Sequence, residues 1–370
     1  MIRQMKILPY EIIELIMNFT AREELVKFSK LSKSCHEICN RLPYKLRILR
    51  VDYRDKDSFI YKYNKVNIKD YIKNNHWNYQ KIHDLYTQNT KLEEIHCECI
   101  GITSVPVLHK MMVFYCNRNK LTNFPIQPKM TEFYGDYNEL TEFPIQPKMT
   151  EFNGNHNRLT SFPIQPELTV FNGNSNLLTS FPIQPEMTTF NGSDNQLVSF
   201  PIQPKMTEFN GRGNQLTGFT VQPCMEFFNG RDNQMTSFPV QPKIIKFSGS
   251  HNQLISFPVQ PELIKFSGNY NHLTNFPIQP KMKIFYGSDN QLISFPIQPK
   301  MTAFYGGCNE LTGFPIQPRM ITFNGSDNLL TSFPIQPEMI TFNGDGNLLI
   351  SFPVQPCLTR FNLKRRYCTM

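Results

Sequence analysis

The chain has 370 residues, a net charge of +8 and nine cysteines, and it contains no apolar run of the roughly 20 residues that a membrane helix needs. The odd cysteine number and the absence of a C-x-x-C pair argue against a disulfide framework and a zinc finger, and they indicate a reducing compartment. Residues 1–91 hold 18 Lys and Arg against 10 Asp and Glu, whereas the rest holds 20 of each. We expect no signal peptide, no membrane partner and a cytoplasmic location.

Residues 1–45 are predicted to form a small all-α domain. A first helix covers 8–19, where Pro9 stands in the first turn and loses no hydrogen bond, and apolar residues recur at helical spacing. Further helices are expected at 23–31 and 34–41. Three short helices bury little core, so this module is expected to lean on a partner or on the next domain.

The sequence of this module carries a resemblance. L-P-x-E-I-I-x-x-I-x-x-F, then E-E-L-x-x-F and L-S-K-x-C, resembles the F-box over residues 5–42, although Cys35 stands where the family often has Trp. The resemblance implies docking on a Skp1-like adaptor protein of cullin-type ubiquitin ligases. The residues that it would assign to Skp1 binding are Leu8, Pro9, Glu11, Ile12, Ile16 and Leu25. The alternative is a plain helical cap that closes the end of a repeat array.

Residues 46–91 are predicted to form a basic connector that shields the first repeat. A strand is suggested at 46–51, and one or two helices at 71–86 around Trp77. The positive charge alone is compatible with nucleic acid, but no nucleic-acid-binding motif is present, so we expect no such partner.

From residue 92 onward the sequence repeats every 19 residues. Fourteen complete units cover 92–357, and a partial unit opens the C-terminal cap and tail at 358–370. The unit at 149–167 reads M-T-E-F-N-G-N-H-N-R-L-T-S-F-P-I-Q-P-E. A fixed period of about 20 residues is the signature of a solenoid.

Positions one, four, six, nine and eleven of the unit read M-x-x-F-x-G-x-x-N-x-L, which resembles the leucine-rich repeat. The resemblance implies a repeat solenoid with a parallel β-sheet on its concave side. Proline at positions fifteen and eighteen fixes φ and disfavours helix, so the convex side is expected to be extended and polyproline-like.

Three positions of the unit, four, nine and fourteen, are predicted to form internal ladders. Phe at positions four and fourteen stacks between turns, and its bulk explains the glycine at position six, which Cys97 and Cys116 replace as small core residues in the first two units. Asn at position nine is expected to be buried and to bond backbone groups of its own and the next turn.

Positions two, three, five, seven and eight vary while this frame stays fixed, which favours a target-binding concave face. Aromatic and Arg side chains dominate protein interfaces, and the densest such group is Tyr115, Arg118, Tyr134 and Tyr137. His156 is one of the variable residues of the 149–167 unit. Variation by drift on a wet surface is the open alternative.

The pattern contains no catalytic constellation, no H-x-x-x-H pair and no phosphate loop, so we expect no enzyme, no cofactor and no metal. By resemblance, the chain would be the substrate-recognition adaptor of a Skp1-cullin-F-box type ubiquitin ligase. The alternative is a non-enzymatic protein-binding or structural scaffold without a ubiquitin link; a bacterial-type effector ligase would need a catalytic cysteine domain after the repeats. The near-identical repeats and the Asn-, Ile-, Lys- and Tyr-rich start resemble F-box repeat proteins of giant DNA viruses of amoebae, which implies the host cytoplasm.

Overall fold

The computed structural model describes residues 48–52, 93–99 and 101–364, and its secondary structure there consists of short β-strands. The chain divides into two compact units, residues 1–140 with 146–148, and residues 141–145 with 149–370. The predicted F-box helices and the segment around Trp77 lie outside the described residues.

Among its described residues, the first unit contains four parallel strands in chain order: β1 (Ile48–Asp52), β2 (Glu94–Glu98), β3 (Val113–Tyr115) and β4 (Glu132–Tyr134). β1 pairs along its whole length with β2, with Ile48 opposite Glu94. The strand suggested by the sequence at 46–51 is therefore present. It precedes the first repeat, and it covers the edge of β2 that would otherwise leave backbone groups unpaired.

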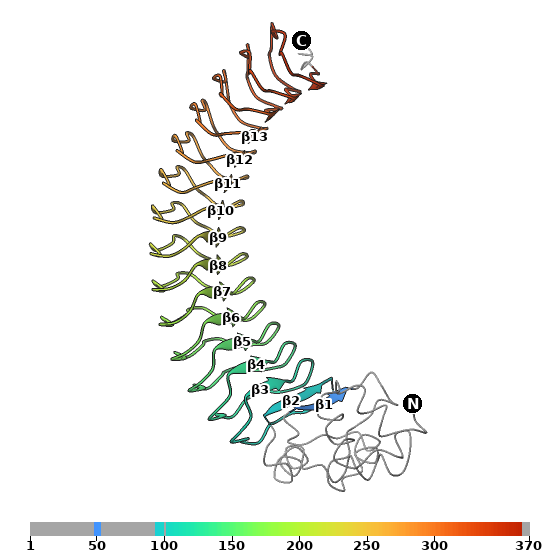
Figure 1. Ribbon diagram of the computed structural model, residues 1–370, viewed down its shortest axis with the longest axis vertical. Coiled ribbons are helices and arrows are strands. Elements are labelled where there is room, and N and C mark those ends of the chain that lie inside the picture. The colour runs from blue at the N-terminus through green and yellow to red at the C-terminus, as the bar shows by residue number, and fades with distance from the viewer. Residues whose placement is uncertain (1–47, 53–92, 100, 365–370) are drawn as a thin grey trace, which may run out of the picture. The chain divides into compact units, whose positions relative to one another are not determined.

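The second unit contains twelve three-residue strands, each provided by one repeat (Figure 1). They are β5 (Glu151–Asn153), β6 (Val170–Asn172), β7 (Thr189–Asn191), β8 (Glu208–Asn210), β9 (Phe227–Asn229), β10 (Lys246–Ser248), β11 (Lys265–Ser267), β12 (Ile284–Tyr286), β13 (Ala303–Tyr305), β14 (Thr322–Asn324), β15 (Thr341–Asn343) and β16 (Arg360–Asn362). All neighbours pair in parallel and in phase; Phe152 lies opposite Phe171, for example. Within this unit the strands follow the inner side of the curve.

The two phenylalanine ladders predicted from the sequence form the core. Rings at position four stack between turns, with centroids of Phe152 and Phe171 5.3 Å apart, and rings at position fourteen do the same, with Phe162 and Phe181 5.8 Å apart. The ladders also meet each other, since the centroids of Phe162 and Phe171 are 4.8 Å apart in an edge-to-face arrangement. Such aromatic pairs add about 0.5–1.5 kcal/mol beyond the burial of their area.

The glycine at position six is explained by space, as the sequence predicts. A Cβ on Gly154 would lie 2.4 Å from Cζ of Phe152, because the ring of each strand folds over the glycine two residues later. In the first two repeats Cys97 and Cys116 take this place and are buried. Burial raises the pKa of both thiols well above its ordinary value.

The asparagine ladder is confirmed, with one correction. The Asn176 carboxamide nitrogen donates to the carbonyl of Gly173 in its own turn (3.1 Å) and to that of Gly154 (2.9 Å), while its oxygen accepts from the Leu159 backbone N–H (2.9 Å). Gly154 and Leu159 belong to the preceding turn, whereas the sequence-based expectation named the next one.

A second amide ladder runs along the back of the solenoid and does not follow from the sequence prediction. Gln184 at position seventeen is fully buried. Its side-chain oxygen accepts from the backbone N–H of Gln165 at 2.7 Å, and its nitrogen donates to the carbonyl of Pro163 at 2.9 Å. Proline has no N–H to offer a neighbouring turn, so the glutamine side chain joins these backbones instead. No helix occurs there in residues 101–364, in agreement with the predicted non-helical back.

Candidate functional site

Each strand exposes two side chains on one side of the sheet. Position four is buried, and positions three and five beside it are partly or fully exposed, as in Glu151 and Asn153 of β5. We call the surface made by positions three and five the strand face. It is described separately for the two units.

In the first unit the strand face carries a stack of three rings. His96, Tyr115 and Tyr134 lie on neighbouring strands, with centroid distances of 4.1 Å and 4.4 Å and nearly parallel planes. The Tyr134 hydroxyl donates to the Glu132 carboxylate at 3.0 Å. The predicted residues Tyr115 and Tyr134 are therefore in direct contact, and His96 joins them.

Arg118 and Tyr137 lie on the turns that follow β3 and β4. The guanidinium carbon of Arg118 is 5.3 Å from the ring centroid of Tyr137, a cation–π contact. The four predicted residues of this unit therefore form two pairs, one on strands and one on turns. His156 lies in the second unit, exposed on the turn after β5.

The backbone restricts position eight more than the sequence suggests. Arg118, Tyr137 and His156 all have φ between 54° and 57°, and the same left-handed conformation recurs at this position along the array. Asp, Asn, His and Gly tolerate this region best. Aspartate and glycine at position eight, as at Asp194 and Gly213, therefore satisfy the turn, and their presence there does not by itself indicate recognition.

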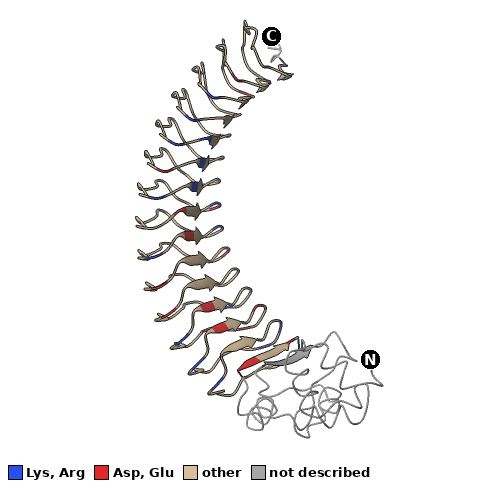
Figure 2. Ribbon diagram, in the orientation of Figure 1, with Lys and Arg blue, Asp and Glu red and all other residues tan. Residues whose placement is uncertain are grey.

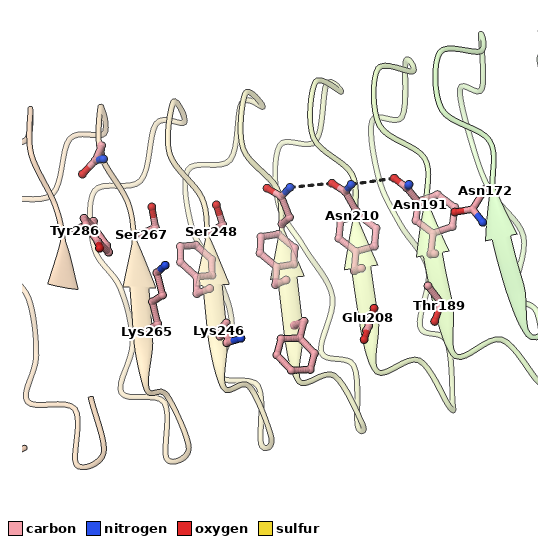
Figure 3. A pocket seen from close by; sticks show the side chains of 17 residues that line it. Asn172, Thr189, Asn191, Glu208, Asn210, Lys246, Ser248, Lys265, Ser267 and Tyr286 are labelled. Atoms are coloured by element: carbon pink, nitrogen blue, oxygen red, sulfur yellow. Dashed lines mark hydrogen bonds between the residues drawn. The ribbon is translucent and has the colours of Figure 1, made fainter. Parts of the chain in front are cut away.

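In the second unit the strand face is hollowed into a groove of about 660 Å³ that extends from β6 to β12 (Figure 3). Its wall at position five is a chain of carboxamides: Asn210 donates to Asn191 and Asn229 donates to Asn210, each at 2.9 Å. On β10 and β11 this row changes to Ser248 and Ser267. The sequence-based site does not include this groove.

Two lysines lie over aromatic rings within the groove. The Lys246 ammonium is 5.1 Å from the ring centroid of Phe227, and the Lys265 ammonium is 5.1 Å from that of Tyr286. Glu208 lies on β8, whereas the two lysines lie on β10 and β11. Figure 2 shows the corresponding change from acidic to basic residues along neighbouring strands. Phe227 is the one feature of the sequence that could have drawn attention to this groove, because no other complete repeat has phenylalanine at position three.

A model of the F-box domain matches residues 5–47. Among similar solved structures are a leucine-rich-repeat protein of Leptospira interrogans (TM-score 0.61, 18% identity, 72% of this chain and 81% of that one) and the functional domain of InlJ from Listeria monocytogenes (0.58, 17%, 70% and 69%). A third is YopM, a leucine-rich effector protein of Yersinia pestis (0.55, 19%, 78% and 92%). A search of curated protein sequences gave no match. The repeats form a leucine-rich-repeat solenoid.

The leucine-rich-repeat assignment fixes the fold and leaves the partner open, because the identities are low. In the described ranges, no His, Cys, Asp and Glu side chains come together in a group of three that could hold a metal ion. Nor does any helix in that part of the chain have the length and apolarity to cross a membrane. The strand face of the leucine-rich repeats is therefore the candidate site, and its chemistry is that of a binding surface.

Proposed function

We propose that the chain is the substrate-recognition adaptor of a Skp1-cullin-F-box type ubiquitin ligase, a role without catalysis of its own. The observation that carries the proposal is the F-box match over residues 5–47, on the same chain as a leucine-rich-repeat solenoid. One part would bind a Skp1-like adaptor protein, and the other would hold the target protein close to the ligase.

The Skp1-binding part of the proposal rests on sequence resemblance. Its residues are Leu8, Pro9, Glu11, Ile12, Ile16 and Leu25, which lie outside the described residues. Apolar side chains of a module with a small core are suited to burial against a partner.

The target-binding part rests on the strand face. Tyr115 and Tyr134 present stacked rings, and Arg118 and Tyr137 form a cation–π pair beside the same strands. Aromatic and Arg side chains held rigid in this way are common anchors of protein interfaces. Within the second unit, His156 and the groove are separate candidate positions for target binding.

Binding of the full chain to purified Skp1, measured by isothermal titration calorimetry, tests the proposal. We expect binding that weakens at least roughly tenfold in the double variant Leu8→Ala, Pro9→Ala, because truncation of buried interface anchors commonly removes 1–2 kcal/mol or more. The control variant Tyr115→Ala, Tyr134→Ala should bind Skp1 as tightly as the original chain. Absence of Skp1 binding to the original chain would favour the scaffold role instead.

The cellular setting is part of the proposal and rests on resemblance to F-box repeat proteins of giant DNA viruses of amoebae. We propose that the protein acts in the host cytoplasm. Fluorescence microscopy of the tagged chain expressed in amoebae should show cytoplasmic signal, and a nuclear or membrane pattern would contradict this setting.

A further inference from the structure

The groove of the second unit contains two neighbouring cations without an ionic partner. Lys246 and Lys265 occupy the same position on adjacent strands, which lie about 4.8 Å apart in a β-sheet. Within the described residues, neither ammonium forms a salt bridge with a carboxylate. By contrast, Lys205 and Lys281 on the turns of the same unit are each paired with a glutamate.

The aromatic rings hold the two ammonium groups in place. Lys246 leans over Phe227 on the strand before it, and Lys265 leans over Tyr286 on the strand after it. The two charges therefore lean apart, and each remains in contact with the groove. A cation–π contact limits the motion of the ammonium group before binding, so each lysine loses less conformational freedom when it binds an anion.

The position-five side chains on the strands of these two lysines are small, which leaves space in the groove beside the ammonium groups. Position five is Asn229 on β9 and Tyr286 on β12, but it is Ser248 on β10 and Ser267 on β11. Figure 3 shows the two serines on the same strands as the two lysines. The ammonium groups of the two lysines and the hydroxyl groups of the two serines therefore lie in the part of the groove between Asn229 and Tyr286. All four groups donate hydrogen bonds, which is the chemistry that receives an anionic side chain.

A negatively charged side chain lies in the same groove, at a defined distance from the two lysines. Glu208 lies at position three of β8 and is exposed. β8 is two strands from β10 and three from β11 in the sheet, or about 10 Å and 14 Å at the usual strand spacing. An extended chain advances about 3.3 Å per residue, so three or four residues bridge these distances.

The length of the groove fits an extended segment. Its lining runs from Asn172 of β6 to Tyr286 of β12, which corresponds to about 29 Å at the usual strand spacing, or about nine residues of extended chain. The row of Asn191, Asn210 and Asn229 along this path offers amide groups to a passing backbone.

We propose that this groove binds an extended segment of the target protein that carries two carboxylate side chains, received by Lys246 and Lys265. A basic side chain three or four residues away would be received by Glu208. The proposal rests on the proposed function in that the segment belongs to the protein that the adaptor selects. It names the chemistry of that target, which the leucine-rich-repeat fold does not.

A displayed library of random nine-residue peptides, selected on the immobilised full chain without Skp1, tests this specificity. We expect enrichment of segments with two acidic residues and a basic residue three or four places away. On the variant Lys246→Glu, Lys265→Glu the selection should shift to basic residues at the acidic places. Enrichment without acidic residues, or the same enrichment on both proteins, would overturn the proposal.

Fluorescence anisotropy with the enriched peptide measures how much each variant changes the affinity for that peptide. The double reversal should weaken binding at least roughly tenfold, because like charges across an interface are strongly unfavourable. The control is Lys300→Glu, which changes one charge on an exposed turn outside the groove and should alter binding less than twofold. Equal losses in the two variants would contradict the assignment. Skp1 binding is measured separately, so a charge-selective groove in a chain that does not bind Skp1 would support the groove and refute the adaptor role.

Discussion

Cζ of Phe152 lies 2.4 Å from the place that a Cβ on Gly154 would occupy, and the same relationship recurs between the strand phenylalanine and the glycine two residues later along the array. The phenylalanine ring occupies the space that a side chain at the glycine would need, so the two residues pack as one unit. The repeats from Gly135 to Gly344 each contain this packing unit beside the two phenylalanine ladders.

The variant Gly154→Ala should lower the free energy of unfolding by about 1–3 kcal/mol, the usual penalty of overpacking a core. Urea denaturation followed by circular dichroism measures this change. Gly218→Ala is the matched control, because nothing lies within 4 Å of its Cβ position. Equal stability of the two variants would show that the ring moves away at little energetic expense.

The glutamine ladder predicts a second difference in stability. Gln184→Ala removes two hydrogen bonds and leaves the backbone N–H of Gln165 and the carbonyl of Pro163 without this partner, which should be destabilising by about 1–3 kcal/mol. Gln196 has an exposed side chain, so Gln196→Ala should change the unfolding free energy by about 0.5 kcal/mol or less. Denaturation midpoints that coincide would contradict a structural role for the ladder.

The buried thiols predict a pH dependence. Burial raises the pKa of Cys97 and Cys116 in the folded state, so above about pH 8.5 the unfolded chain loses these protons first. Their contribution to stability is complete below that pH and declines as pH rises further. The decline between pH 8 and 10 should be smaller in Cys97→Ala, Cys116→Ala. A variant whose stability falls as steeply as that of the original chain would exclude the thiols as its source.

The thiols also predict selective labelling. Cys308 and Cys357 are exposed, whereas Cys97 and Cys116 are buried. Brief treatment of the folded protein with iodoacetamide, followed by peptide mass mapping, should modify the exposed pair, and only denaturation should release the buried pair. Modification of Cys97 at the rate of Cys308 would be inconsistent with the core position.

The repeat register predicts tolerance to the loss of a whole turn. Deletion of 301–319 joins equivalent positions of neighbouring repeats and should keep the strand-rich circular dichroism spectrum and a cooperative transition, because each turn contacts only its neighbours. Deletion of 301–310 removes the same strand but shifts the register by part of a turn, and it should lower the midpoint more. Equal midpoints would argue against an in-phase array.

The period and the side-chain volumes made much of the fold predictable. Phenylalanine at positions four and fourteen of every complete repeat after the first predicted the ladders, and its bulk predicted the glycine that Gly154 exemplifies. Gln184 was not predicted, because glutamine between two prolines has the same sequence signal as a surface residue. Its burial depends on the backbone N–H and C=O groups that the adjacent turns present, which the sequence does not display.

The candidate site was less predictable than the frame. Tyr115 and Tyr134 could be paired from their common position in successive repeats, and the structure stacks them. The shape and charge of the groove depend on the side-chain conformations of Lys246 and Lys265 and on the small side chains of the neighbouring serines. These are relations between strands and rotamers, and a pattern of residue types does not determine them. At position eight the structure weakens a sequence-based interpretation. The residues there vary between repeats, but the left-handed backbone favours certain residue types at this position whether or not a target binds.

The central claim is that one chain holds a Skp1-like protein and a target segment together. Size-exclusion chromatography of the full chain with purified Skp1 and the fluorescent acidic peptide tests it directly. We predict one peak that contains all three components, with Skp1 lost in Leu8→Ala, Pro9→Ala and the peptide lost in Lys246→Glu, Lys265→Glu. Elution of Skp1 apart from the peptide-loaded original chain would contradict the adaptor role.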